Sequence, residues 1–189
     1  PAGAIPGDYV FRVMYPPDTF AANAFQQIAL NKGYENIAVL QVDDPFGNGM
    51  VDAFTEGFQA NGGGEVAVVT FAPEPPDLSG EVSNLSSEVA RLKEAGETAV
   101  FIVGILGDGQ KALQLAVTDP ELGSVEWLGV ENLANPEILA DPAHAQLLRD
   151  ANFTGSLTGD TLLDGSGGAF FGDNRGRVEF HNVTFTNNR

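Results

Sequence analysis

Early in the chain, apolar residues follow two patterns in turn: short continuous runs, and stripes with spacings of three and four. Residues 37–42 form a short, almost wholly apolar run, which is typical of a strand covered on both faces. From Asn48 an apolar stripe with spacings of three and four indicates an amphipathic helix, and its members are Val51, Phe54 and Phe58. Residues 65–71 are the next β-branched run. The pattern predicts a βαβ unit, whose crossover should be right-handed.

The same alternation continues on both sides of this unit. Further strands are predicted at residues 9–14, 98–104 and 125–130. Further helices are predicted where apolar stripes recur: one capped by Asp18 or Thr19 and ending at Lys32 and Gly33, one entered through Asp77, Leu78 and Ser79 and reaching Gly96, one containing Ala112 and Val117, and a short stretch after Pro136.

Strands that alternate with helices at this spacing predict an α/β fold with a doubly wound parallel sheet. A chain of 189 residues is long enough for one full domain or one domain with part of a second. We divide it into a Pro- and Gly-rich linker at 1–8, a lobe at 9–158 and a Gly- and Asn-rich, β-rich tail at 159–189.

The net charge of the chain limits the kinds of binding partner that we expect. The 26 acidic residues outweigh the 9 basic ones, giving a net charge of −17, which argues against binding to nucleic acid or to an anionic membrane. The chain has no cysteine, which excludes disulfides, thiolate metal sites and cysteine nucleophiles. No apolar run approaches the length of a membrane span, and the first residues do not look like a signal peptide.

Three turns are the first places to look for a site, because ligands of such sheets bind beyond the carboxyl ends of the strands. They are residues 43–49, 105–109 and 131–132. The first reads D-D-P-F-G-N-G, and the helix after it carries A-F-T-E-G-F before a Gly-rich exit. This order resembles the type 1 periplasmic solute-binding proteins, and within them the branched-chain amino acid (Leu/Ile/Val) binding family of ABC transporters. Phe11, Arg12 and Asp18 resemble the point where that family's chain enters its second lobe.

The resemblance implies the architecture and the setting of the protein. Residues 9–158 would be the second lobe alone, with strand order 2-1-3-4-5 and with the first lobe missing. The lobes would close like a Venus flytrap over a small molecule, an amino acid or an amide. An ABC permease would be the partner, and the location would be periplasmic or extracellular.

The resemblance also implies a set of ligand-binding residues. Phe46 would pack against the ligand, although it would equally suit an aromatic that covers the sheet. Glu131 matches the acid that pairs with an α-ammonium group, and its alternative is a loop acid or a helix cap. Ile105 and Leu106 match a position that contacts the ligand side chain, but core packing is the favoured interpretation for both. Asp44 belongs to the same ligand-facing turn as Phe46.

Enzyme interpretations rest on weaker signals. Residues 47–52 hold two of the three glycines of a dinucleotide-binding fingerprint, and no Walker lysine follows any Gly-rich turn. His144 and His181 are isolated in sequence and suit ordinary surface or loop histidines. Asp43 and Asp44 are adjacent, so they are a poor acid/base pair. We therefore expect a binding module rather than an enzyme, with no cofactor and no metal.

The tail suggests an alternative role. Residues 167–170 and 185–188 resemble one coil of the right-handed β-helix repeats of polymorphic outer-membrane proteins, although a chance Gly/Asn-rich tail is also open. One such coil cannot bury its own face. The leading hypothesis is a lobe that captures amino acids or similar solutes for ABC transport. The alternatives are a sensor or adhesin-type surface protein with a β-helix stalk and, more remotely, a small doubly wound enzyme.

Overall fold

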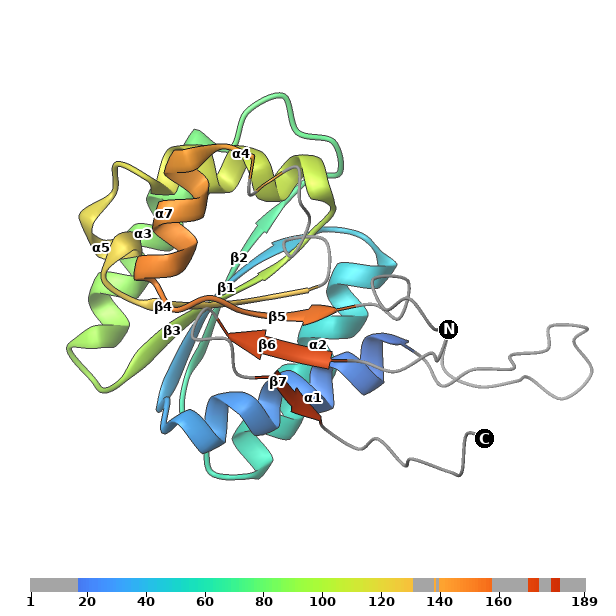
Figure 1. Cartoon of the computed structure of the whole chain (residues 1–189). Coiled ribbons are helices and arrows are strands. Elements are labelled where there is room, and N and C mark those ends of the chain that lie inside the picture. Colours follow the sequence, from blue (N-terminus) through green and yellow to red (C-terminus); the bar gives the residue numbers. More distant parts are fainter. Residues whose placement is uncertain (1–16, 131–137, 139, 158–169, 174–177, 181–189) are drawn as a thin grey trace, which may run out of the picture.

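The computed structural model describes residues 17–130, 138, 140–157, 170–173 and 178–180 (Figure 1). Its helices are α1 (Pro17–Lys32), α2 (Pro45–Ala60), α3 (Ser79–Lys93), α4 (Leu106–Ala116), α5 (Pro120–Gly123) and α7 (Pro142–Asp150). Its strands are β1 (Asn36–Val42), β2 (Val66–Phe71), β3 (Thr98–Val103), β4 (Glu126–Gly129), β5 (Thr154–Leu157), β6 (Phe170–Asp173) and β7 (Val178–Phe180). None of these helices is both long and apolar enough to cross a membrane.

The strands form one sheet in the order β2-β1-β3-β4-β5-β6-β7. β1 to β5 pair parallel with one another. The predicted doubly wound parallel sheet is therefore confirmed, and so is the order 2-1-3-4-5 that the resemblance implies. Since all five strands run the same way, the loops that follow them emerge at one edge of the sheet, here named the carboxyl edge; the opposite edge is the amino edge.

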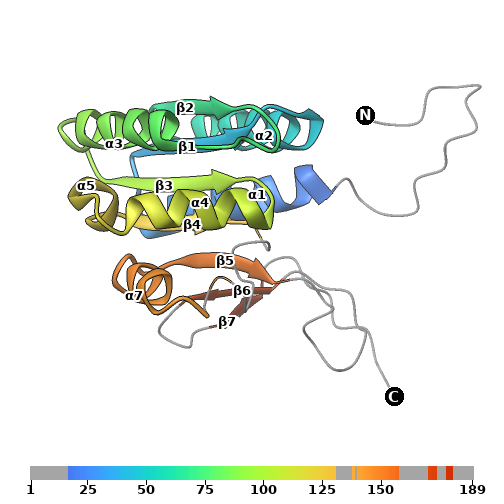
Figure 2. The ribbon, with the colours of Figure 1, turned by 90° about the horizontal axis from the view of Figure 1, so that it is seen from above.

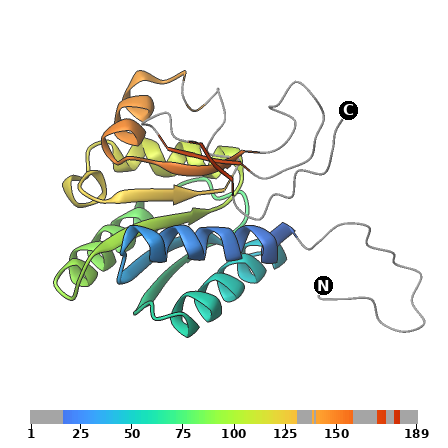
Figure 3. The same ribbon diagram turned by 60° about the horizontal axis from the view of Figure 1, so that its bottom comes forward.

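Helices cover both faces of the sheet. Figure 2 looks onto the face that carries α3, α4, α5 and α7, and Figure 3 shows α1 and α2 in front of the other face. Side chains of β1 alternate between the two apolar cores: Ala38 and Leu40 pack under α3, whereas Ile37 and Val39 pack under α1 and α2. A strand buried on both sides favours apolar residues at successive positions, which explains the apolar run of β1 at residues 37–40.

The ends of the helices differ in detail from the predictions. Asp18 and Thr19 lie inside α1, so the prediction that one of them caps this helix is wrong. Gly33 ends α1 as expected, in a left-handed conformation with φ of 82° that glycine adopts without strain. The predicted turn 105–109 is also wrong, because α4 begins at Leu106 and only Ile105 remains outside the helix.

The tail contributes two strands to the same sheet. β6 pairs antiparallel with β5, and β7 pairs antiparallel with β6. Together they widen the sheet beyond β5. A β-helix coil stays a prediction, because most of residues 159–189 lie outside the described residues. The linker 1–8, the strand 9–14, Phe11 and Arg12 also lie outside them, and the domain limits at 8 and 158 stay predictions.

Candidate functional site

The turn after β1 fixes the start of α2. Asp44 is extended, and its carboxylate accepts a hydrogen bond from the Gly47 backbone N–H at 2.7 Å, which is the geometry of a helix N-cap. Pro45 follows at the first helical position, where no N–H is needed. A Cβ on Gly47 would lie 2.0 Å from the Val42 carbonyl oxygen. Only glycine therefore allows α2 to begin this close to the end of β1.

A short chain of side-chain hydrogen bonds lies beside this turn, and we name it the Gln41 relay. Gln41 Nε2 donates to Asn48 Oδ1 at 2.7 Å, and Asn48 Nδ2 donates to Asp43 Oδ1 at 3.0 Å. Gln41 is 7% exposed and is the residue next to last in β1. Its other polar side-chain atom, Oε1, is buried and has no hydrogen-bond partner among the described residues. The relay therefore ends in an unsatisfied acceptor just below the carboxyl edge.

The turn after β3 lies next to the turn after β1. The two strands pair in register up to Gln41 and Val103, so both chains leave the sheet side by side. Ile105 follows in an extended conformation and is 50% exposed. Its backbone N–H donates to Asp108 Oδ2 at 3.4 Å, which partly satisfies a carboxylate whose side chain is only 2% exposed. A large aliphatic group thus faces solvent above a buried acid.

Acidic groups dominate the electrostatics of this edge. Burial raises the pKa of Asp108 above its usual value. The negative charges of Asp44 and Glu74 raise it further, while the hydrogen bond from Ile105 and the charge of Lys111 lower it. Lys111 also donates to the backbone carbonyl of the loop that carries Glu74. The edge therefore favours a cationic or hydrogen-bond-donating group over an anion.

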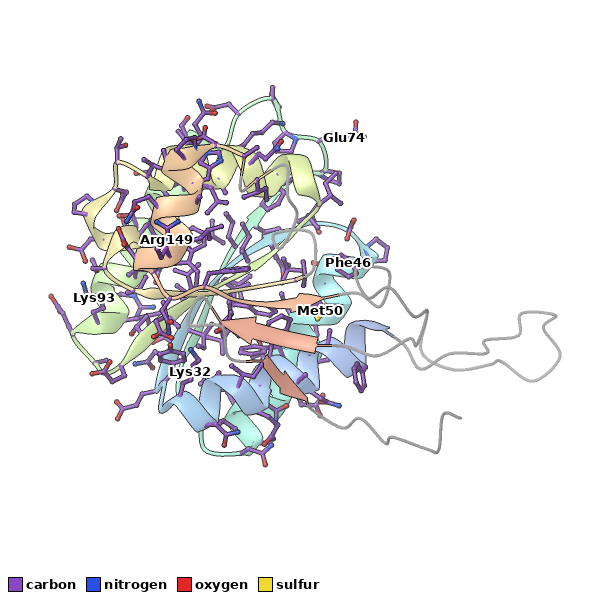
Figure 4. All side chains as sticks on the ribbon, in the orientation of Figure 1. Lys32, Phe46, Met50, Glu74, Lys93 and Arg149 are labelled. Carbon is purple, nitrogen blue, oxygen red and sulfur yellow. The ribbon has the colours of Figure 1, made fainter. Side chains whose placement is uncertain are left out.

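Figure 4 places the labelled side chains on the ribbon. Phe46 and Met50 lie where α2 begins, whereas Lys32 and Lys93 lie toward the opposite edge. The candidate site is thus a ridge of half-exposed apolar and acidic side chains along the ends of β1 and β3. Among the described residues, no group of three or more His, Cys, Asp or Glu side chains is arranged to hold a metal ion.

Comparison with known families decides the class of the protein. The model of a family described as periplasmic binding protein matches residues 2–119. The chain belongs to the periplasmic binding protein family. This membership agrees with the parallel sheet, with helices on both faces and with the turns gathered at the carboxyl edge.

Individual relatives of this periplasmic binding protein are distant in sequence. An uncharacterised protein of Methanocaldococcus jannaschii is 27% identical over 135 residues, which cover 71% of this chain and 31% of that protein. Among solved structures, a leucine-binding protein of Thermotoga maritima superposes with a TM-score of 0.54 at 19% identity, over 74% of this chain and 36% of the other. A fatty acid ABC transporter substrate-binding protein of Thermomonospora curvata gives 0.53 at 16% identity, over 74% and 33%.

These comparisons show the fold, which is that of one lobe of a type 1 periplasmic binding protein. The chain spans about a third of the length of the relatives it matches, 31% in the Methanocaldococcus protein and 36% in the leucine-binding protein. The resemblance inferred from the D-D-P-F-G turn thus identified the broad family. The narrower branched-chain amino acid assignment stays a prediction.

The residues predicted to bind ligand in this periplasmic binding protein are placed as follows. Phe46 is half-buried and packs against both apolar cores, so it covers the end of the sheet while keeping part of its ring exposed. Asp44 caps α2. The interpretation of Ile105 as a core residue is wrong, because α4 begins one residue later and leaves the Ile105 side chain beyond the sheet. Leu106 begins α4, and its side chain lies outside the described part, as does Glu131.

Two polar residues at this edge, Gln41 and Asp108, were not predicted from the sequence. Gln41 interrupts an otherwise apolar strand, and that interruption was a usable signal. Asp108 lies in the first turn of α4, where an acid interacts favourably with the helix dipole, and its burial could not be anticipated. The interpretation of His144 as a surface or loop residue is wrong, since it lies in α7 and is 7% exposed. His181 lies outside the described residues.

Proposed function

We propose that this chain is one lobe of an extracytoplasmic solute-binding protein that captures a small molecule with an amino group, an aliphatic amino acid or a similar compound. The captured solute would be passed to an ABC permease. The role is binding, without chemical change of the solute. Family membership supports this class of function, as do the similar solved structures of a leucine-binding protein and of a fatty acid ABC transporter substrate-binding protein.

The observation that carries the proposal is the exposure of Ile105. Ile105 is a large aliphatic side chain directly beyond a central strand, and it is 50% exposed, so half of its surface can contact a ligand. It lies at the edge where ligands of doubly wound sheets bind. An apolar contact from Ile105 and the ring of Phe46, beside acidic groups, suits a solute with an apolar part and a cationic part.

A lobe of this kind supplies half of a site. In the proposed mechanism the ligand first contacts the carboxyl edge, and a first lobe then closes over it and adds its own contacts. Glu131 is proposed to pair with the ligand ammonium group, and Leu106 to contact its side chain. The isolated chain is expected to bind weakly, in roughly the millimolar range, since the contacts of the closed state are missing.

The test is an NMR titration of the ¹⁵N-labelled chain with L-leucine, L-phenylalanine, urea and benzoate. Binding should shift amide signals of the turns after β1 and β3. Replacing Ile105 with Ala should weaken binding of an aliphatic amino acid roughly threefold to tenfold and change the free energy of unfolding by less than about 0.5 kcal/mol. Glu131→Gln should weaken binding of amines and leave benzoate unaffected.

Val117→Ala is the matched control. Val117 is also an exposed aliphatic residue flanking α4, but it follows the helix at its far end and is 37% exposed. This variant should bind like the wild type. Micromolar or tighter binding by the isolated chain would contradict the half-site, and shifts confined to the amino edge would contradict the proposed location.

A further inference from the structure

The Gln41 relay has a fixed direction. An ionised Asp43 has only acceptors, so the group that faces it must be the Asn48 Nδ2 donor. Asn48 Oδ1 then faces Gln41 and requires a donor there, which is Gln41 Nε2. Rotating the Gln41 amide by half a turn would bring two oxygens together. Gln41 Oε1 therefore points away from the relay in every consistent arrangement of these three side chains.

Leaving Gln41 Oε1 without a hydrogen bond lowers the stability of the fold. Gln41 is nine-tenths buried, and its Oε1 has no hydrogen-bond partner within the part of the chain that the structure describes. A buried acceptor without a donor loses its hydration and gains nothing in return. Such groups are rare in folded proteins, and each one calls for an explanation. Its position one residue before the end of β1 places it just below the proposed binding edge.

We propose that Gln41 Oε1 accepts a hydrogen bond from an N–H group of the bound solute, and that Gln41 is therefore a specificity-determining residue for amines. This inference rests on the proposed function and names the class of solute. Asp43, Asp44 and Glu74 surround the start of α2 and the adjoining turns with negative charge, which disfavours an anion at this helix N-terminus. A cationic N–H donor would form a hydrogen bond with the unsatisfied oxygen and would be attracted by this negative charge.

A second glutamine in the molecule serves as a matched control. Gln26 of α1 is 5% exposed, and its Oε1 is also buried with no hydrogen-bond partner in the described segments. It faces Gly57 of α2, where an added Cβ would lie 2.0 Å from this oxygen. Gly57 is about 18 Å along the helix from Pro45, at 1.5 Å per residue. Gln26 thus has the same unsatisfied chemistry far from the carboxyl edge.

The experiment compares Gln41→Met with Gln26→Met in the full 189-residue chain, each by thermal unfolding and by NMR titration. Methionine keeps the length of the side chain and removes the amide. The probes are L-leucine with 4-methylpentanoate, and L-phenylalanine with 3-phenylpropanoate, because each pair differs only in the amino group. The wild type should bind the amine of a pair more tightly than its partner. Gln41→Met should weaken amine binding about tenfold and leave binding of the deaminated compound unchanged.

Thermal stability separates a binding role from a structural one. Gln41→Met should unfold at the wild-type temperature or above, because it removes an unsatisfied acceptor while half-exposed Asn48 turns to water. Gln26→Met should leave both affinities unchanged. A Gln41→Met variant that unfolds at a lower temperature and binds amines like the wild type would overturn the inference, as would tighter binding of the deaminated compounds by the wild type. If none of the four probes binds, that result would instead contradict the proposed function itself.

Discussion

The two edges of the sheet are built differently. At the amino edge, Glu126 at the start of β4 accepts hydrogen bonds from Lys32 Nζ at 2.7 Å, from the Tyr34 hydroxyl and from Asn152 Nδ2 at 2.5 Å. These partners come from the end of α1, the loop before β1 and the loop before β5. The Glu126 carboxylate therefore joins β4 to two segments that are distant from it in the sequence, residues 32–34 and the loop at Asn152.

At the carboxyl edge the side chains are less completely paired. Gln41 Oε1 has no hydrogen-bond partner in the described structure, Ile105 is half exposed, and burial raises the pKa of Asp108. The main chain of this edge is nevertheless tightly fixed by the Asp44 cap and the close approach of Gly47 to Val42. The difference indicates that the cluster around Glu126 contributes stability, whereas Gln41 and Ile105 at the carboxyl edge are held in fixed positions where a ligand could use them.

Gly47→Ala tests most strongly whether the carboxyl edge is rigid. The new Cβ would meet a backbone oxygen at 2.0 Å, which cannot move without displacing β1 or α2. The free energy of unfolding should fall by about 3 kcal/mol, a drop of roughly 10 °C in Tm measured by circular dichroism. Gly107→Ala, at the same edge with nothing within 4 Å of its Cβ, should instead raise Tm by about 2 °C. Equal effects of the two changes would show that the turn after β1 adapts.

Glu126→Gln tests the amino edge. Burial pushes the pKa of Glu126 upward, but hydrogen bonds from Lys32, Tyr34 and Asn152 outweigh it and hold the pKa below its usual value of 4.5. A lowered folded pKa means that the carboxylate stabilises the fold above about pH 4.5 and loses this effect as the pH falls through the folded pKa. The variant should lose about 1–2 kcal/mol at pH 7, and this loss should shrink as the pH falls below about 4.5.

An exposed ion pair provides the control for that change. Glu121 accepts from Lys93 Nζ at 2.8 Å, and both side chains are about two-fifths exposed, 41% and 38%. Glu121→Gln should cost less than about 0.5 kcal/mol at any pH. A loss as large as that of Glu126→Gln would mean that the cluster around Glu126 has no special role.

Asp108→Asn has the smallest expected effect and the opposite sign. A carboxyl group with a raised folded pKa binds its proton more tightly in the folded state, so its ionisation opposes folding above its usual value of 3.8. Asparagine keeps an acceptor for the Ile105 N–H and carries no charge. Tm should rise by about 1–2 °C at pH 7 and stay unchanged near pH 3. A lower Tm at pH 7 would show that the hydrogen bond to Ile105 needs the charge.

The fold was predictable because its signals are local. The apolar run of β1 and the stripe of α2 each span a few residues, and burial on both faces of the sheet leaves few alternatives. Ile105 shows where such signals fail. An apolar residue after a buried strand suggests core packing, and only the start of α4 at Leu106 places it outside.

The candidate site depends on contacts that sequence spacing does not encode. Gln41 reaches Asn48 across the turn, and the carboxylates of Asp44 and Glu74 act on Asp108 from different loops. These relations follow from the register of neighbouring strands, which is set by the whole sheet. The predicted ligand contact of Phe46 cannot be read from sequence spacing either, because it depends on a ligand and on a closing lobe.

The bond between Lys32 and Glu126 also bears on the order of folding. It joins residues 94 positions apart, whereas β1, β2 and β3 associate through a single stretch of neighbouring segments. Contacts of such high sequence separation form late, because closing a long loop costs entropy before the contact repays it. Glu126→Gln should therefore speed unfolding and leave the refolding rate almost unchanged in stopped-flow measurements. The amino-edge cluster would then act as a kinetic latch, which sets how long the folded lobe persists.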